Sequence, residues 1–177
     1  MDSLKTVVFI LLVLWMMLVL GYILPLADFG IQPRTAPGLI GILCAPFIHA
    51  GPDHLVTNSI SLLILGPIFM VMERRLSFEI ILYIILLSGL GTWLIGRAEF
   101  THIGASGVVY GLLGYLLAAG IFKRNIKEIL VSILVFVLYG GAIWGIFPTT
   151  GFVSWESHLS GFLSGIAVAK IYSDRCR

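Results

Sequence analysis

Long runs of apolar residues, separated by short polar segments, make up most of the chain. A helix that crosses a hydrocarbon core of about 30 Å needs about 20 residues at a rise of about 1.5 Å each. Six apolar segments meet or approach this length, at residues 7–26, 55–72, 78–95, 106–122, 129–147 and 158–172. The pattern therefore predicts an all-α polytopic membrane protein, folded as a bundle of six transmembrane helices.

The composition also indicates a membrane-embedded chain. Hydrophobic residues fill 59% of the 177 positions and charged residues 11%, whereas soluble domains carry about 25% charged residues. We find no internal repeat, so residues 1–177 are expected to form a single membrane domain. The first apolar segment is too long and uninterrupted for the core of a cleaved signal peptide, and we expect it to be retained.

Lysines and arginines are unevenly distributed between the two sides that six crossings would create. Only Arg34 and Arg97 fall on the outer side. The other nine of the eleven fall on the side of the termini: Lys5, Arg74, Arg75, Lys123, Arg124, Lys127, Lys170, Arg175 and Arg177. By the positive-inside rule, both termini are predicted to be cytoplasmic. The net charge of only +2 gives no indication of nucleic-acid binding.

The connection between the first two crossings, residues 28–53, is the longest in the chain. Its apolar part, residues 39–50, is too short to span the bilayer and is expected to lie in the membrane interface. Cys44 in this connection and Cys176 in the C-terminal tail are predicted to lie on opposite sides of the membrane. This topology excludes a disulfide between them.

Polar residues that are unusual in a membrane gather at the outer ends of three predicted helices. His54 and Asn58 begin the second helix, Ser106 begins the fourth and His158 begins the sixth. Ser106 lies 17 residues, and His158 lies 14 residues, from the cytoplasmic ends of their segments, or about 25 Å and 21 Å along a helix. Polar groups at this depth must face protein or a water-filled cavity, so a pocket is implied.

Ser106 has two interpretations. It can cap the fourth helix, because serine is a favoured N-cap and Gly104 permits a tight turn before it. It can instead be a nucleophile, provided that a neighbouring base accepts its proton. The helix start would add free N–H groups and a positive dipole, which stabilise a developing oxyanion. Tyr110 shares the helix face of Ser106 and could pack on an imidazole or simply belong to the core.

His158 is the candidate base. Gly161 and Gly165 follow it in a GxxxG spacing, which is typical of close helix packing in membranes. The fourth helix is also rich in glycine, so the two helices are predicted to approach closely enough for a short contact between Ser106 and His158. Glu156 is expected to be solvated in a loop, so the pattern predicts a Ser–His dyad rather than a triad.

His54 and Asn58 stand four residues apart and project from one helix face. They form either a polar interhelical hydrogen bond or, beside a serine nucleophile, the donors of an oxyanion hole. His49 is expected to brace the adjoining loop by hydrogen bonding, and His102 to be a solvated loop residue. A metal site is the main rival for these histidines, but structural zinc sites usually add cysteines, so no metal is predicted.

Three ordered motifs resemble those of the rhomboid family of intramembrane serine proteases, over about residues 39–172. They are a HxxxxHxxxN pattern at the second helix, a GxSG turn at the head of the fourth, and a histidine followed by GxxxG in the sixth. The matching positions are His49, His54 and Asn58, then Gly104, Ser106, Gly107 and Tyr110, and finally His158, Gly161 and Gly165. The first outer loop lacks the Trp-Arg pair that many members carry there.

The resemblance implies that Ser106 is the nucleophile and His158 the general base. Tyr110 would pack against the base, and His54, Asn58 and the backbone N–H of Ser106 would stabilise the oxyanion. The implied activity is cleavage of peptide bonds in or near the transmembrane segments of membrane-protein substrates, with no metal or organic cofactor. The expected location is the lipid bilayer of a cell, most simply the inner membrane of a bacterium.

Two other classes of function are kept as alternatives. A catalytically silent rhomboid-like protein would bind membrane-protein clients, but such a relative is expected to have lost one member of the dyad. A small transporter would place ionic residues deep in the membrane and often shows repeat symmetry. The chain shows no repeat, and Glu79, the one acid inside a proposed crossing, lies near the cytoplasmic end of that crossing.

Overall fold

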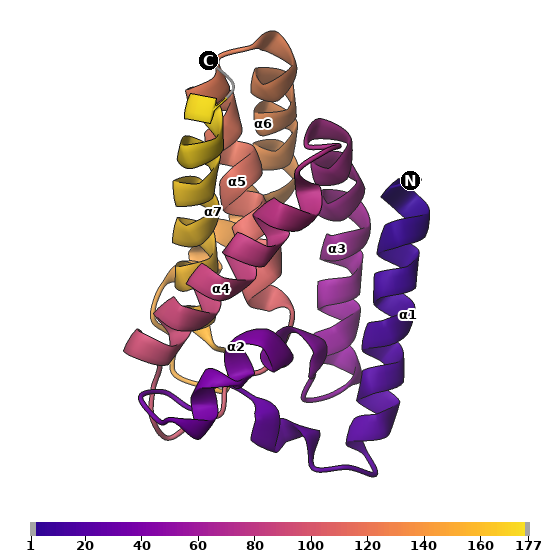
Figure 1. Cartoon of the computed structure of the whole chain (residues 1–177), viewed down its shortest axis with the longest axis vertical. Coiled ribbons are helices and arrows are strands. Elements are labelled where there is room, and N and C mark those ends of the chain that lie inside the picture. The colour runs from indigo at the N-terminus through magenta and orange to yellow at the C-terminus, as the bar shows by residue number, and fades with distance from the viewer. Residues whose placement is uncertain (1–2, 176–177) are drawn as a thin grey trace.

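In the computed structural model, which describes residues 3–175, the chain is a bundle of helices joined by short connections (Figure 1). The long helices are α1 (Ser3–Gly21), α3 (Pro52–Met72), α4 (Ser77–Ile95), α5 (Ser106–Lys123), α6 (Ile126–Tyr139) and α7 (Trp155–Arg175). The shorter ones are η1 (Leu26–Phe29), η2 (Pro37–Leu39), α2 (Gly41–Cys44), η3 (Ala45–Phe47) and η4 (Gly140–Ile146). The predicted all-α class is confirmed, whereas Cys176 and Arg177 lie outside the described residues.

Within residues 3–175, five helical segments are long and apolar enough to cross a membrane. They are α1, α3, α4, α5, and α6 continued through η4 to Ile146. α7 is equally long, with 21 residues, but it is more polar because it carries several serines and the charged residues Glu156 and Lys170. A sixth crossing therefore stays a prediction. Apolar side chains on the outside of the bundle, such as Leu12 (64% exposed) and Val137 (74% exposed), are available to lipid.

Two predicted boundaries differ from the structure for local reasons. α1 ends at Gly21 rather than at residue 26, and a proline at position 25 disfavours helical geometry in the residue before it. The fifth apolar segment divides into α6 and the 3₁₀ helix η4 where two glycines follow Tyr139, because glycine is a poor helix former. α6 begins at Ile126 because the Asn125 side chain accepts hydrogen bonds from the next turn at 3.0 and 3.2 Å.

α5 is the centre of the bundle and the most buried of the five candidate spans. It contacts α7, α4, α6 and α3, while α1 packs at one edge against α3 (Figure 1). The contact between α5 and α7 depends on glycine: a Cβ on Gly161 would overlap the carbonyl of Gly107, and one on Gly165 would overlap the carbonyl of Gly111. Small residues allow this approach, which in a membrane is stabilised by close packing.

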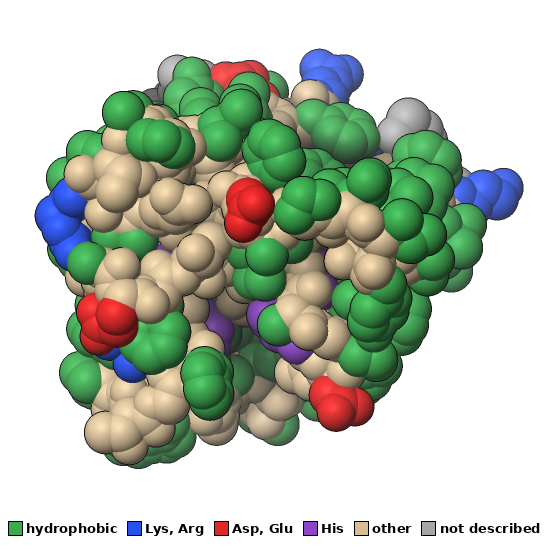
Figure 2. Space-filling view, turned by 90° about the horizontal axis from the view of Figure 1, so that it is seen from below, with side chains coloured by type: hydrophobic (Ala, Val, Ile, Leu, Met, Phe, Trp, Pro, Cys, Tyr) green, Lys and Arg blue, Asp and Glu red, His purple; other side chains and the backbone are tan. Residues whose placement is uncertain are grey.

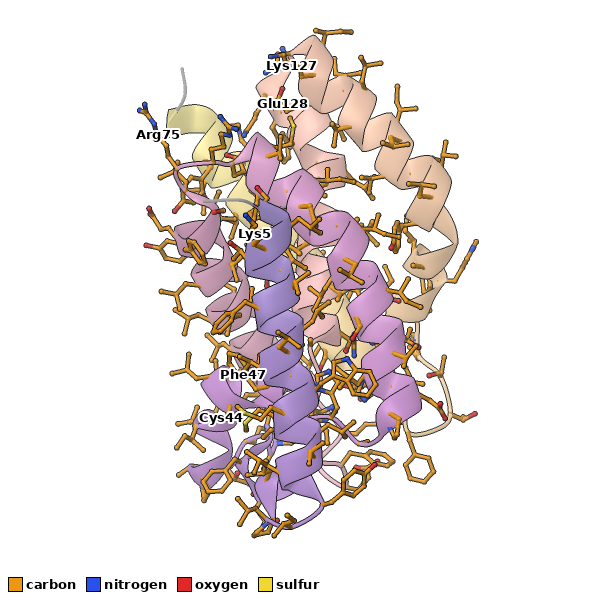
Figure 3. The ribbon with its side chains drawn as sticks, turned by 90° about the vertical axis from the view of Figure 1, so that its right-hand side faces the viewer. Lys5, Cys44, Phe47, Arg75, Lys127 and Glu128 are labelled. Carbon is orange, nitrogen blue, oxygen red and sulfur yellow. The ribbon has the colours of Figure 1, made fainter. Side chains whose placement is uncertain are left out.

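The two ends of the bundle differ in charge and in structure. Both chain termini lie at one end (Figure 1), and Figure 3 shows Lys5, Arg75 and Lys127 at that same end. The opposite end holds the irregular connection between α1 and α3, which includes Cys44 and Phe47 (Figure 3). This asymmetry is the one that the positive-inside rule associates with a cytoplasmic location for the basic end. That both termini are cytoplasmic remains a prediction.

Candidate active site

The turn that precedes Ser106 is hydrogen-bonded to the connection between α1 and α3. His102 and Ile31 exchange two backbone hydrogen bonds of 2.9 Å, and the N–H of Gly104 donates to the carbonyl of Ala45 at 2.9 Å. Gly104 has a φ of +121°, a conformation that side-chain-bearing residues rarely adopt. Ser106 then begins α5, with its side chain half-buried.

Ser106 is not the N-cap of this helix. The cap position belongs to Ala105, and no side chain makes a capping hydrogen bond there. The capping interpretation of the serine therefore loses its support. The free N–H groups of the first turn of α5, together with its positive dipole, stay available near the hydroxyl.

His158 stands in the first turns of α7 and is held on two sides. Its Nδ1 lies 3.0 Å from the carbonyl oxygen of Gly145. Its ring stacks on Tyr110, with 4.2 Å between centroids and an interplanar angle of 11°. The Tyr110 hydroxyl in turn donates to the carbonyl of Ala142 at 2.8 Å. Because a carbonyl can only accept, Nδ1 carries the proton in the neutral ring, and Nε2 keeps a lone pair.

The structure brings Ser106 and His158 to the same end of one helix pair. Tyr110, on which the imidazole stacks, lies one turn after Ser106 on the same face of α5. The adjacent Gly107 faces Gly161 across the contact between the helices. No hydrogen bond joins the hydroxyl to the imidazole in the described structure. Such bonds are often long without a substrate and tighten in the complex.

His54, on α3, lies beside the same turn, and Asn58 follows one turn later on that helix. The His54 imidazole lies against Gly104, where a Cβ would come within 2.7 Å of its Nε2. Asn58 is buried, and its Nδ2 donates to the carbonyl of His54 at 3.1 Å, within its own helix. The amide therefore makes an intrahelical bond rather than the interhelical one that the sequence left open. One of its two N–H groups remains for another acceptor.

His49 braces the turn from the other side. Its Nε2 accepts a hydrogen bond of 3.2 Å from the N–H of Ala105, and its ring meets the His54 ring edge to face at 5.1 Å. Burial, and secondarily the charge of His54, lower the pKa of His49 from 6.5 to about 4. The ring is therefore neutral near pH 7 and can act as the acceptor.

Two expectations about polar residues were wrong. His102, expected in solvent, is 2% exposed: its Nδ1 lies 2.5 Å from Oγ of Ser154 and its Nε2 lies 3.2 Å from the carbonyl of Arg97. Burial lowers the pKa of His102. Glu156, expected in a solvated loop, is fully buried in an ion pair with Arg97. Hydropathy assigned both to outer loops, and it cannot detect that loop residues pair with one another.

The site opens at the end of the bundle opposite the termini. Figure 2 views this end and shows histidine side chains recessed within hollows of the surface. A small pocket near the turn is lined by Gly104 and Gly107 and by the polar residues Ser88, Thr92 and Ser157, whereas Ser106 and His158 do not line it. Within residues 3–175, no three His, Cys, Asp or Glu side chains gather in a way that would hold a metal ion.

Comparison with known proteins identifies the family of this chain. A sequence model of the Rhomboid domain matches residues 36–175. The chain belongs to the rhomboid family. The predicted resemblance is thereby confirmed, and the matched range contains every candidate site residue from His49 to Gly165.

Relatives of this rhomboid chain occur in bacteria and plants. An uncharacterized protein of Mycobacterium tuberculosis is 40% identical over 154 residues, which cover 81% of this chain and 63% of the relative. A Bacillus subtilis protein, provisionally named a rhomboid protease, is 28% identical over 161 residues, covering 89% of this chain and 75% of that protein. RHOMBOID-like protein 5 of Arabidopsis thaliana is 32% identical over 129 residues, which cover 67% of this chain and 39% of that protein. The chain thus spans less than two thirds of the length of its mycobacterial relative.

Proposed function

We propose that this rhomboid protein is an intramembrane serine endopeptidase that cleaves peptide bonds in or near the transmembrane segments of other membrane proteins. The observation that carries the proposal is the orientation of His158. Its Nδ1 donates to Gly145 while its ring stacks on Tyr110, one turn from Ser106. This leaves Nε2 as the basic nitrogen on a ring held at the level of the serine.

The chemistry follows serine acyl transfer. Oγ of Ser106 attacks the substrate carbonyl carbon, and Nε2 of His158 takes the hydroxyl proton as the bond forms. When the tetrahedral intermediate collapses, the peptide C–N bond breaks and the imidazolium returns the proton to the leaving amine. Water then repeats the sequence: it loses a proton to His158, attacks the acyl ester and releases Ser106. The reaction needs no metal or organic cofactor.

The developing oxyanion needs donors close to Ser106. The backbone N–H of Ser106 belongs to the first turn of α5, where N–H groups lack helical partners and the dipole is positive. His54 lies against Gly104, two residues before Ser106, and Asn58 has one amide N–H group left to donate. We assign these three groups to the oxyanion hole, where removal of one donor typically costs about 10²- to 10³-fold in rate.

The setting of this chemistry is a bilayer. The apolar helices α1 and α3–α6 support an integral membrane location, and the mycobacterial relative is consistent with a bacterial cell membrane. The substrate class is then a membrane protein whose helix unwinds locally to expose a carbonyl at the level of Ser106. Six crossings with cytoplasmic termini would put the pocket on the outer face.

Reconstitution with a transmembrane reporter substrate tests the proposal. Ser106→Ala and His158→Ala should each abolish cleavage, whereas Ser164→Ala should cleave like the wild type. Ser164 is the matched control because it is a buried serine of α7 whose hydroxyl donates to the carbonyl of Ser160 within the same helix. Cleavage that survives either dyad substitution would refute the assigned roles. A wild-type protein that binds the reporter without cutting it would instead support a silent client-binding protein.

A further inference from the structure

An ion pair between a partly exposed arginine and a buried carboxylate lies beside the proposed base. Nε of Arg97 lies 2.6 Å from Oε1 of Glu156, whose side chain is 0% exposed. The backbone N–H of Arg97 donates to the same oxygen at 3.3 Å, and Nη2 donates to Oε2 at 3.4 Å. Glu156 stands in the first turn of α7, two residues before His158. The connection between α4 and α5 is therefore bound to the start of α7 by three hydrogen bonds from Arg97 to the carboxylate of Glu156.

Arg97 also holds the segment that leads into α7. Its Nη1 donates to the carbonyl of Gly151 at 3.1 Å, and its Nη2 donates to the carbonyl of Val153 at 2.8 Å. The Phe100 ring lies under the guanidinium, 4.6 Å from ring centroid to Cζ. The planar fork of arginine is suited to such simultaneous bonds in fixed directions.

A row of hydroxyl groups makes a second link to the same turn. Nδ1 of His102, from the connection between α4 and α5, lies 2.5 Å from Oγ of Ser154. Oγ of Ser154 lies 2.7 Å from Oγ of Ser157, and Oγ1 of Thr92 on α4 lies 3.2 Å from that oxygen. The first turn of α7 is thus tied to α4 and to the connection that continues into Ser106.

The first turn of α7 transmits this anchoring to the imidazole. The carbonyl of Ser154 accepts from the N–H groups of Ser157 at 3.1 Å and His158 at 3.2 Å. We propose that Arg97 and Glu156 are positioning residues that hold His158 in register with Ser106. The inference rests on the proposed dyad and explains how the base is fixed although its Nδ1 bonds to a backbone carbonyl and not to a carboxylate.

The ion pair between Arg97 and Glu156 fixes the position of the first turn of α7 more than it stabilises the fold. Removing two charges from water costs about as much as their attraction returns, and an apolar pair of similar size is often equally stable. An apolar pair, however, makes no directional hydrogen bonds and cannot fix the orientation of the first turn of α7. Because α7 carries the base, a shift of its first turn changes the distance from Nε2 to the serine, and a misplacement of about 1 Å can cost about 100-fold in rate.

Glu156→Gln tests the inference, because it removes the charge and keeps the shape. The matched control is Glu99→Gln, the same change at an exposed position of the same connection. The full chain in liposomes is assayed for kcat and KM on a transmembrane reporter and for deuterium exchange at the amides of Ser157 and His158. We expect Glu156→Gln to lower kcat about 10- to 100-fold, to leave KM within about twofold and to speed exchange about tenfold.

The outcomes separate this inference from the proposed function. Equal exchange, or equal kcat per folded molecule, in Glu156→Gln and Glu99→Gln would overturn the positioning role. If Glu156→Gln folds poorly, Arg97→Met/Glu156→Leu replaces it as the stable apolar pair and should show the same loss of kcat; wild-type kcat there would also overturn the role. A wild type that cleaves nothing, with exchange still faster in Glu156→Gln, would refute the proposed function and support the anchoring of α7.

Discussion

A single methyl group added at Gly161 should separate the two helices that carry the dyad. A Cβ at this position would lie 2.9 Å from the carbonyl carbon of Gly107 and 3.1 Å from its Cα, whereas ordinary contacts begin at 3.4 Å. Both neighbours are backbone atoms of α5, so neither can rotate away. In Gly161→Ala the helices must therefore move apart locally by about 0.5 Å or more.

Two quantities should respond to this separation. Overpacking of this kind lowers the free energy of unfolding by about 1–3 kcal/mol. His158 lies one turn from the new methyl group, so its imidazole should withdraw from Ser106, and kcat should fall about 10- to 100-fold. Unfolding in detergent measures the first quantity, and cleavage of a transmembrane reporter measures the second.

Gly21→Ala is the matched control for this substitution. A Cβ there would meet only the Leu26 side chain, at 3.9 Å, and alanine favours the helical conformation. This variant should keep the stability and the kcat of the wild type. If Gly161→Ala behaves like Gly21→Ala in both assays, the close approach of α5 and α7 is not what aligns the dyad, and the reasoning fails.

Two further predictions concern the rings around the site. Tyr110→Phe keeps the stack on His158 and loses the hydrogen bond to Ala142, so kcat should fall only about 2- to 10-fold; a loss as large as that of His158→Ala would contradict the packing role. The pKa of His49 falls from 6.5 to about 4 on folding. Between these two pH values, His49 is therefore protonated in the unfolded chain and neutral in the folded chain. Unfolding free energy should accordingly drop, by up to about 3 kcal/mol, as the pH falls from 6.5 through 4, and His49→Gln should show a weaker dependence; an equal dependence in this variant would refute the assignment.

The helical bundle could be predicted from hydropathy, since long apolar runs have few alternatives in a bilayer. The end of α1 and the division of α6 from η4 were missed because proline and glycine act locally within segments that remain apolar. The apolar pattern also predicts a crossing at residues 158–172; α7 forms a helix there, but it is more polar than the five candidate spans. Its glycines face α5, and this packing relation appears in the sequence only as a spacing.

Some polar residues of the site could be selected from the sequence, and others could not. Ser106, His54 and His158 could be selected because polar groups deep in a predicted membrane helix are costly and require a reason. Arg97 and Glu156 could not, because each lies in a predicted outer loop, where a charge is ordinary. The only indication in the sequence that they pair was that they carry opposite charges on the outer side, where few basic residues lie. Pairing across 59 positions of sequence is visible only in the folded chain.

Labelling of Ser106 by a serine-directed fluorophosphonate is the decisive measurement for the Ser106–His158 dyad, because it reports the activated hydroxyl without requiring a substrate. The purified protein is treated in liposomes, and the modified residue is located by mass spectrometry. We expect Ser106 to be labelled in the wild type and in Ser164→Ala, and labelling to be lost in His158→Ala. Labelling of Ser106 at an equal rate in His158→Ala, or no labelling of the wild type, would contradict a Ser106–His158 dyad.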